Sequence, residues 1–339
     1  MDDDAAKLGN LVDYWTPLLL RMSVEAGIIE AFGHLERLPE AVAAETGTHA
    51  PTLARVLRAL ASRGVFESCS DGAYRLSALG QRLLANRPDS LAGLAAFRPW
   101  EIHAWAEVDH TRKTGEPAFP HNFGHGFWDH LAANPNLSKK FNAQMLRRTA
   151  TMLSLGRSLY DWPAEGTIFD LGGGNGLLLS QVLQRAPSLQ GVLFDLPHDA
   201  KEAHAVLQAA GVADRAKVVA GNLFADPLPP GHEIYVLASV LHDWGDPDAE
   251  TILRKCLEAV PADGRLLIFE SVLPEGPQQE LGKMVDLHML VLFGGKERTE
   301  SEWRMLLDRA GFSVTKIVPT RGLSWIEATP RKLARDAGH

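Results

Sequence analysis

The chain has 339 residues, of which 45% are hydrophobic and 22% are charged, and its formal net charge is -8. These values are typical of a soluble globular protein of two domains, and the negative charge disfavours a polyanion such as nucleic acid as the main partner. No apolar run reaches the roughly 18 residues of a membrane span, and the acidic N-terminus lacks the positive charge of a secretory signal. The two cysteines, Cys69 and Cys256, have no zinc or disulfide spacing. We therefore expect a cytoplasmic protein without a membrane or nucleic-acid partner.

Residues 1–90 have the pattern of a winged helix. Apolar residues recur at helical spacing from about residue 8 to 32, and helical segments follow at 41–45 and 51–62. Two short strands, 64–67 and 74–76, flank a polar turn. Helix 51–62 would read DNA in such a fold, but its apolar face and its few basic residues favour a packing and dimerisation module. We expect a homodimer in which the first helices exchange between subunits.

Residues 91–160 are rich in aromatic residues and histidine. The pattern predicts several helices joined by a loop from Pro117 to His125. Aromatic rings in this region line either a core or a pocket for a flat substrate. The histidines His121, His125 and His130 lack the spacing of a metal motif, so we expect no bound metal.

Residues 161–339 alternate between strands and helices, which predicts a Rossmann-like α/β fold with a parallel sheet covered by helices on both faces. No helix separates the last two strands, so we expect the final strand to pair antiparallel with its neighbour. The predicted strands are residues 167–171, 191–195, 217–220, 233–237, 265–270, 312–317 and 323–328.

A glycine-rich turn follows the first of these strands. Asp170 ends the strand, and Gly172 and Gly174 lie in a turn that leads into a helix whose free N–H groups would face a ligand. A dinucleotide fingerprint would need a sixth-position glycine, where this chain has Leu177. Asp195 ends the next strand, at the distance expected for a carboxylate that binds ribose hydroxyls. These features favour S-adenosylmethionine over NAD.

The ends of the following strands supply further ligand candidates, because all carboxyl ends of a parallel sheet meet at one edge. Leu196 and Leu223 are predicted to sandwich an adenine ring, and Ser239 opens the segment after the fourth strand. Asn222 is either an adenine-binding amide or a turn residue.

Four stretches of the second half resemble the small-molecule O-methyltransferases of the plant caffeate and isoflavone type and their bacterial antibiotic-pathway relatives. The resemblance implies a methyl transfer from S-adenosylmethionine, with His242 as general base and with Glu270 and Glu297 as the acidic residues that position it. The N-terminal module resembles the dimerisation domain of that family. The stretches are Phe-Asp-Leu-Gly-Gly-Gly-Asn-Gly at 169–176, Leu-His-Asp-Trp at 241–244, Leu-Ile-Phe-Glu at 267–270 and Gly-Gly-Lys-Glu-Arg-Thr at 294–299.

The resemblance leaves the substrate open. Asn222 and Ala238 replace an acidic residue and a lysine of the plant pattern, which puts the cofactor contacts there in doubt. We expect a small aromatic hydroxylated substrate, such as a fused-ring polyketide. The pocket candidates are Asp243, Phe141, Met145, Met289 and Phe293, and for the last four a plain core role stays open.

Two other functions remain to be weighed. The same fold and cofactor can serve a hydroxylation or a decarboxylation, against which the intact His242 and Glu297 count. A winged-helix transcription regulator is the second alternative, and steeply salt-dependent binding to duplex DNA would support it.

Overall fold

A computed structural model divides the chain into two units, residues 1–102 and 103–339. The predicted division at residues 90 and 160, which gives segments 1–90, 91–160 and 161–339, stays a prediction. The structure describes residues 3–87, 89–95, 98–134, 136–138, 141, 160–278, 280–320 and 322–331.

The first unit is a winged helix, as predicted. Its core helix α5 buries the side chains of Leu53, Val56, Leu57 and Leu60, so the apolar face of this helix is used within the unit. Strands β1 and β2 form the antiparallel hairpin. The elements are α1 (Asp3–Leu11), α2 (Trp15–Glu25), α3 (Ile28–Phe32), α4 (Pro39–Thr46), α5 (Ala50–Ser62), β1 (Phe66–Ser68), η1 (Ser70–Gly72), β2 (Tyr74–Leu76), η2 (Gly80–Leu83) and η3 (Ala92–Ala95).

The apolar stripe at residues 8–32 is divided among three helices. Breaks occur between α1 and α2 and again at Gly27, which adopts a φ of 71°. The later helix α3 is buried, whereas Leu11, Tyr14 and Trp15 are 82%, 64% and 62% exposed. The stripe therefore leaves a large apolar surface uncovered by its own unit.

Short helices precede the sheet: α6 (Pro99–Ala106), α7 (Val108–Thr114), α8 (Ala118–Phe123) and α9 (Phe127–Ala133). The prediction of a loop from Pro117 to His125 is wrong, because α8 occupies most of it. Pro120 lies in the first turn, where a missing N–H costs no helical hydrogen bond, and Gly124 ends the helix with a φ of 76°.

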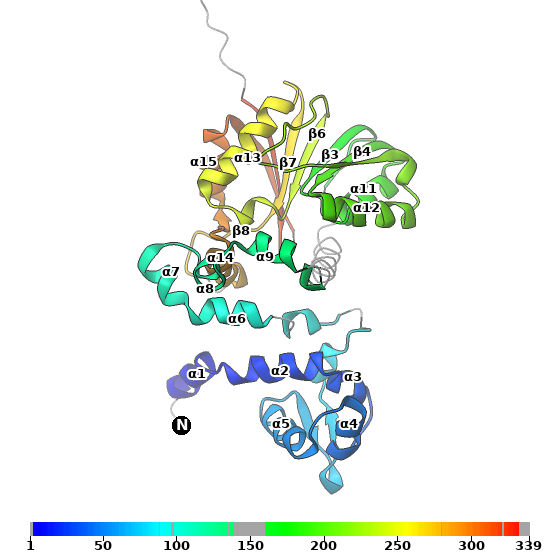
Figure 1. Cartoon of the computed structure of the whole chain (residues 1–339), viewed down its shortest axis with the longest axis vertical. Helices are drawn as coiled ribbons and strands as arrows, with labels where there is room; N and C mark the ends of the chain where they lie inside the picture. The colour runs from blue at the N-terminus through cyan, green and yellow to red at the C-terminus, as the bar shows by residue number, and fades with distance from the viewer. Residues whose placement is uncertain are drawn as a thin grey trace, which may run out of the picture. The chain divides into compact units, whose positions relative to one another are not determined.

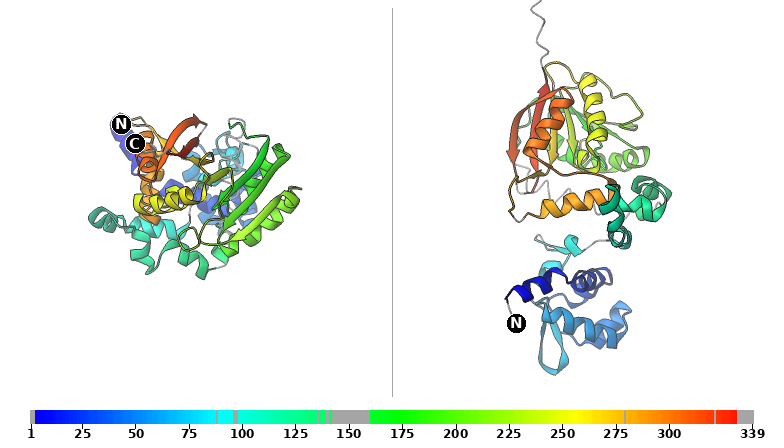
Figure 2. Two further views of the ribbon diagram at one scale, coloured as in Figure 1. Left: turned by 90° about the horizontal axis from the view of Figure 1, so that it is seen from above. Right: turned by 90° about the vertical axis from the view of Figure 1, so that its left-hand side faces the viewer.

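The second unit is built on a seven-stranded sheet in the order β10-β11-β7-β6-β3-β4-β5. The pairs among β3 to β7 are parallel, while β11 runs antiparallel to both β10 and β7, which confirms the predicted topology. Figure 2 shows β10 and β5 at opposite edges. The strands are β3 (Glu165–Leu171), β4 (Ser188–Asp195), β5 (Ala216–Ala220), β6 (Ile234–Ala238), β7 (Arg265–Glu270), β10 (Phe312–Pro319) and β11 (Ser324–Pro330).

Helices cover both faces of this sheet and form two apolar cores (Figure 1). One core contains α13 and α15, and the other contains α11 and α12. None of the described helices combines the length and the apolar character that crossing a membrane requires. The remaining elements are α11 (Leu177–Arg185), α12 (Pro197–Ala209), η4 (Ala213–Arg215), η5 (Leu241–Asp243), α13 (Asp246–Ala259), β8 (Val272–Leu273), α14 (Leu281–Phe293), β9 (Arg298–Thr299) and α15 (Glu300–Arg309).

The strand order reverses between β3 and β6. From β3 the chain moves outward to β4 and β5, and it then crosses back to β6 and β7 on the other side. Ligands of such sheets bind outside the carboxyl ends at this reversal, where neighbouring loops diverge. The β3–α11 turn and the β6–α13 segment meet there, so the sheet itself brings the two predicted halves of the site together.

Candidate active site

The turn between β3 and α11 depends on glycine. Gly172 and Gly174 have φ values of 66° and 56°, which side chains rarely adopt. A Cβ on Gly172 would lie 2.8 Å from the Cγ2 atom of Val240, which follows β6. The bare backbone therefore passes close to the β6 segment and presents the first N–H groups of α11 to the carboxyl edge of the sheet.

Two carboxylates flank this turn. Asp195 accepts hydrogen bonds from the backbone N–H of Gly174, at 2.7 Å, and of Leu196, at 2.6 Å. Asp170 is 1% exposed, and neither of its carboxyl oxygens has a hydrogen-bond partner within the described part of the chain. Burial, and then the neighbouring Asp195, raise the pKa of Asp170 to about 7. A buried carboxylate without partners is the kind of group that a ligand completes.

The other cofactor candidates lie near the same edge. Leu223 approaches the position of a Cβ on Gly172 to 3.8 Å. Ser239 is exposed and has a φ of 54°, a strained value for a residue with a side chain. The Oδ1 atom of Asn222 accepts hydrogen bonds from the N–H groups of Phe224 and Ala225, at 2.8 and 3.2 Å. These contacts are those of a turn residue, which is one of the two roles predicted for Asn222. Its contact with adenine stays a prediction.

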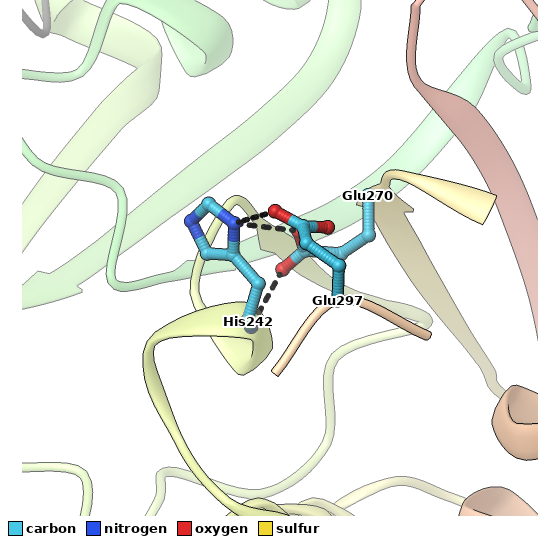
Figure 3. A group of neighbouring side chains, drawn as sticks. All are labelled: His242, Glu270 and Glu297. Atoms are coloured by element: carbon cyan, nitrogen blue, oxygen red, sulfur yellow. Dashed lines mark hydrogen bonds and ion pairs between the residues drawn. The ribbon is translucent and has the colours of Figure 1, made fainter. Parts of the chain in front are cut away.

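His242 lies in η5, just after β6, and is 6% exposed. Its Nδ1 atom is 2.8 Å from Oε1 of Glu297, a residue that lies 55 positions later in the chain. Figure 3 shows the imidazole ring facing the carboxylates of Glu297 and Glu270. The structure thus brings together the three residues that the sequence singled out for catalysis.

The two glutamates make different contacts. Glu270, at the end of β7, accepts with Oε1 the backbone N–H groups of Val240 and Leu241 at 2.8 and 2.9 Å, and that of His242 at 3.4 Å. Its Oε2 atom lies 3.8 Å from His242 Nδ1, beyond hydrogen-bond reach. Glu270 therefore holds the backbone of the η5 turn, while Glu297 holds the imidazole ring.

Negative charge surrounds the imidazole. Burial alone lowers the pKa of His242, but the carboxylates of Glu270, Asp243 and Glu297 outweigh it and raise that pKa to about 9. The pKa of Glu270 is raised mainly by its complete burial. The donor atoms of His242, Glu270 and Glu297 lie within 4.8 Å of one another, a spacing that could also hold a metal ion.

The predicted pocket residues are partly assembled. The ring of Phe293 lies 4.7 Å from that of Phe127, and the Phe141 ring lies 5.3 Å from the same Phe127. Met289 is buried on α14, one turn before Phe293. The Oδ1 atom of Asp243 is 3.5 Å from His242 Nε2. Met145 lies outside the described residues.

The sequence did not reveal Asp286. Its Oδ1 atom accepts the backbone N–H of Glu297 at 2.9 Å and so fixes the residue that holds the imidazole. Asp286 is half-buried, and its pKa is raised mainly by that burial. A carboxylate in the middle of the mainly apolar helix α14 was the available signal, because such a residue needs a polar partner.

Comparison with known proteins identifies the family. A profile of the O-methyltransferase domain matches residues 105–313, and one of the O-methyltransferase dimerisation domain matches residues 10–86. The phenazine O-methyltransferase PhzM of Lysobacter antibioticus is 39% identical over 322 residues, which cover 94% of each chain. The O-demethylpuromycin-O-methyltransferase of Streptomyces alboniger is 39% identical over 330 residues, 94% of this chain and 86% of the relative.

A solved structure extends the similarity to the cofactor. The O-methyltransferase of neocarzinostatin biosynthesis, in complex with S-adenosylmethionine and 2-hydroxy-5-methyl naphthoic acid, has a TM-score of 0.84 and 34% identity, covering 95% of this chain and 98% of that one. The chain belongs to the O-methyltransferase family. It is an S-adenosylmethionine-dependent enzyme whose homologues include bacterial methyltransferases of antibiotic pathways.

The residues around the β3 turn fit this cofactor. The space beside Gly174 is open where a side chain would fill it, and the two oxygens of Asp170, which have no partner among the described residues, can accept from N–H or O–H donors. The ammonium of the methionyl part and the ribose hydroxyls are such donors. The shape of the β3 turn and the carboxylate of Asp170 therefore suit a cationic nucleoside.

Proposed function

We propose that this enzyme methylates a phenolic hydroxyl of an aromatic natural product, a fused-ring polyketide or a compound of similar shape, with His242 as general base. The observation that carries the proposal is the 2.8 Å contact between His242 Nδ1 and Glu297 at the carboxyl edge of the sheet. When Nδ1–H donates to this carboxylate, the neutral ring keeps its lone pair on Nε2. That nitrogen can then accept the phenolic proton.

The raised pKa of His242 suits this acceptor. A phenol has a pKa near 10, as tyrosine does, so a base with a pKa of about 9 takes its proton with little uphill cost. Glu297, Glu270 and Asp243 stabilise the imidazolium that forms. The base must first be neutral, so the rate should rise with pH through the pKa of His242.

The cofactor candidates are assigned to two parts of the methyl donor. We assign Asp170, Gly172, Gly174 and Asp195 to the polar parts of the donor, and Leu196, Asn222, Leu223 and Ser239 to its adenosine end. When bound, the sulfonium would supply an electrophilic methyl group. The protein would have to hold the acceptor oxygen in line with it, an alignment that can itself provide several kcal/mol.

The acceptor class follows from the aromatic residues near α14. Phe141, Phe293 and Met289 offer ring faces and a thioether, which favour a flat aromatic molecule. The names of the relatives, which include a phenazine and a naphthoate methyltransferase, point to acceptors of this kind. We assign Asp243, beside the base, to the polar side of the same pocket.

We further infer a homodimer formed through the matched dimerisation domain, in which exposed residues such as Leu11 and Trp15 are covered. Exchange of the first helices between subunits is part of this proposal. A cytoplasmic location is favoured by the free thiols of Cys69 and Cys256 and by the metabolic source of the methyl donor.

The test is an incubation of the enzyme with S-adenosylmethionine and a panel of phenols, hydroxynaphthoates and hydroxyphenazines, followed by mass spectrometry. Methyl transfer adds one methyl group and releases S-adenosylhomocysteine, whereas hydroxylation or decarboxylation would not. His242→Ala should lower kcat/KM by about 10²- to 10⁴-fold while affinity for S-adenosylhomocysteine stays unchanged. The matched control is His204→Ala, on the exposed side of α12. Equal activity of both variants would refute the assignment of His242.

A further inference from the structure

Arg298 is fully buried, although it carries a permanent charge. Its Nη1 group donates to the backbone oxygens of Leu241 and Lys296, at 3.2 and 3.0 Å, and Nη2 donates to that of Trp244 at 3.0 Å. Nε and Nη2 also contact Oδ1 of Asp246, at 3.0 and 2.9 Å. All three nitrogens of the guanidinium therefore donate to acceptors inside the protein.

These contacts join the two loops that carry the catalytic pair. We call residues 240–246 and 294–299 the paired loops. The Leu241 oxygen belongs to the peptide bond that leads into His242, and the Lys296 oxygen to the one that leads into Glu297. One rigid group thus fixes the backbone at both ends of the His242–Glu297 hydrogen bond.

The paired loops are also in direct contact. The N–H of Lys296 donates to the His242 oxygen at 2.9 Å, and a Cβ on Gly295 would lie 2.2 Å from that same oxygen. Asp246 anchors the guanidinium from the start of α13. Partial burial would raise the pKa of Asp246, but the adjacent Arg298 and further cations outweigh it and hold the pKa below its usual value.

We propose that Arg298 is a positioning residue for methyl transfer, which sets the distance and angle between the His242 imidazole and the Glu297 carboxylate. This inference rests on the proposed function of His242. A lysine cannot replace it, because a single ammonium cannot span three backbone oxygens and a carboxylate in one plane. Stability alone would not demand this residue, since buried ion pairs often gain nothing over apolar packing.

The chain offers a matched control. Arg309 contacts Oδ2 of the same Asp246 and Oε2 of Glu250, both at 3.1 Å, but its side chain is 43% exposed. Unlike Arg298, it makes no described hydrogen bond to the backbone oxygens of the paired loops. Arg298→Lys and Arg309→Lys are therefore the same chemical change, made at two arginines that both contact Asp246. Only the first should disturb His242.

The first measurement is the ¹⁵N spectrum of the histidine rings in the full-length enzyme, with the His242 signals identified from a His242→Asn variant. We expect Arg298→Lys to move the His242 ring nitrogens toward the averaged shifts of a free imidazole, and Arg309→Lys to leave them unchanged. Unchanged His242 signals in Arg298→Lys would overturn the proposal. Calorimetric binding of S-adenosylhomocysteine checks that each variant is folded; if Arg298→Lys is not, Asp246→Asn decides by the same spectra.

The second measurement is turnover with the best phenolic acceptor. Because a displacement of about 1 Å can cost on the order of 100-fold in rate, we expect Arg298→Lys to lower kcat by roughly 10- to 100-fold with KM nearly unchanged. In a His242→Ala background the same change should have little further effect, since both act through one base. Fully additive losses would contradict the proposal. Wild-type turnover of His242→Ala would instead refute the proposed function, and the ring spectra would still decide the role of Arg298.

Discussion

Glu270 and Asp170 are both buried carboxylates at the ends of parallel strands, yet their surroundings differ. Glu270 Oε1 accepts backbone N–H groups of the η5 turn, whereas neither oxygen of Asp170 has a partner among the residues that the structure describes. The first is therefore held by the protein, and the second is left for a ligand. Under the proposed function, the catalytic side of the edge would be preorganised, and the cofactor side would be completed on binding.

This difference has an energetic meaning. Keeping a buried carboxylate charged without hydrogen-bond partners costs free energy, and burial accordingly raises the pKa of Asp170 to about 7. Contacts from a cationic ligand would recover that cost. In contrast, the His242–Glu297 pair is held by contacts within the protein itself. Substitutions beside His242 should therefore lower turnover, whereas substitution of Asp170 should weaken the affinity for the methyl donor.

Among the substitutions that test this comparison, crowding the paired loops should have the largest effect. Gly295→Ala places a Cβ 2.2 Å from the His242 oxygen, so the backbone of the base must shift. Overpacking of this kind costs about 1–3 kcal/mol of stability, and a shift of about 1 Å can lower kcat on the order of 100-fold. Steady-state kinetics and thermal unfolding measure the two effects. Gly93→Ala, at an exposed position where nothing lies within 4 Å, is the control; equal behaviour of the two variants would show that the close approach is unimportant.

On the cofactor side, Asp170→Asn should weaken binding of S-adenosylmethionine while the ligand-free protein becomes no less stable. A hydrogen bond to a charged group contributes about 1.5–3 kcal/mol, which corresponds to a roughly 10- to 100-fold rise in Kd. Calorimetry gives Kd, and thermal unfolding gives the stability. Asp214→Asn, an exposed carboxylate in η4, is the control. Unchanged affinity in Asp170→Asn would mean that this carboxylate does not complete its contacts with the donor.

Glu297→Gln separates the charge of the pair from its shape. Losing a charge-assisted hydrogen bond of about 1.5–3 kcal/mol predicts a roughly 10- to 100-fold lower plateau of kcat/KM. Because Glu297 contributes to raising the pKa of His242, its removal should lower that pKa, and the rising limb of the pH profile should move to lower pH. A limb that stays in place, or moves to higher pH, would refute this coupling.

The smallest effect on chemistry is expected in the first unit. Trp15→Ser removes an exposed aromatic side chain from the proposed subunit contact, where anchors of this type contribute roughly 2 kcal/mol or more. We expect weaker dimers in analytical ultracentrifugation and little change in kcat at protein concentrations that keep the dimer intact. A dimerisation constant equal to that of the wild type would place the contact elsewhere.

The sequence predicted the sheet well because strand ends and helix starts leave local signals. The apolar run before Asp170 and the glycines after it defined the β3 turn, and the last two strands are antiparallel as expected. Local signals failed at Pro117–His125, because the prolines there are compatible with the start of α8 as well as with a loop.

The division of roles between Glu270 and Glu297 could not be predicted. Neither local sequence shows which glutamate contacts the imidazole. Only the long-range packing of β7 and of the loop after α14 decides which carboxylate reaches the ring. Arg298 was hidden for the same reason, since its partners lie up to 57 positions away in the chain. Arginine side chains are mostly exposed in folded proteins, but this fold buries Arg298.

The most direct test of a general base at His242 uses two acceptors of the same shape that differ in the acidity of the phenol, one of them carrying a nitro group. Single-turnover rates of the wild type and of His242→Ala are measured with each. If His242 removes the phenolic proton, the loss in His242→Ala is large for the weakly acidic phenol and small for the acidic phenol, which ionises without help. An equal loss with both acceptors would contradict the account.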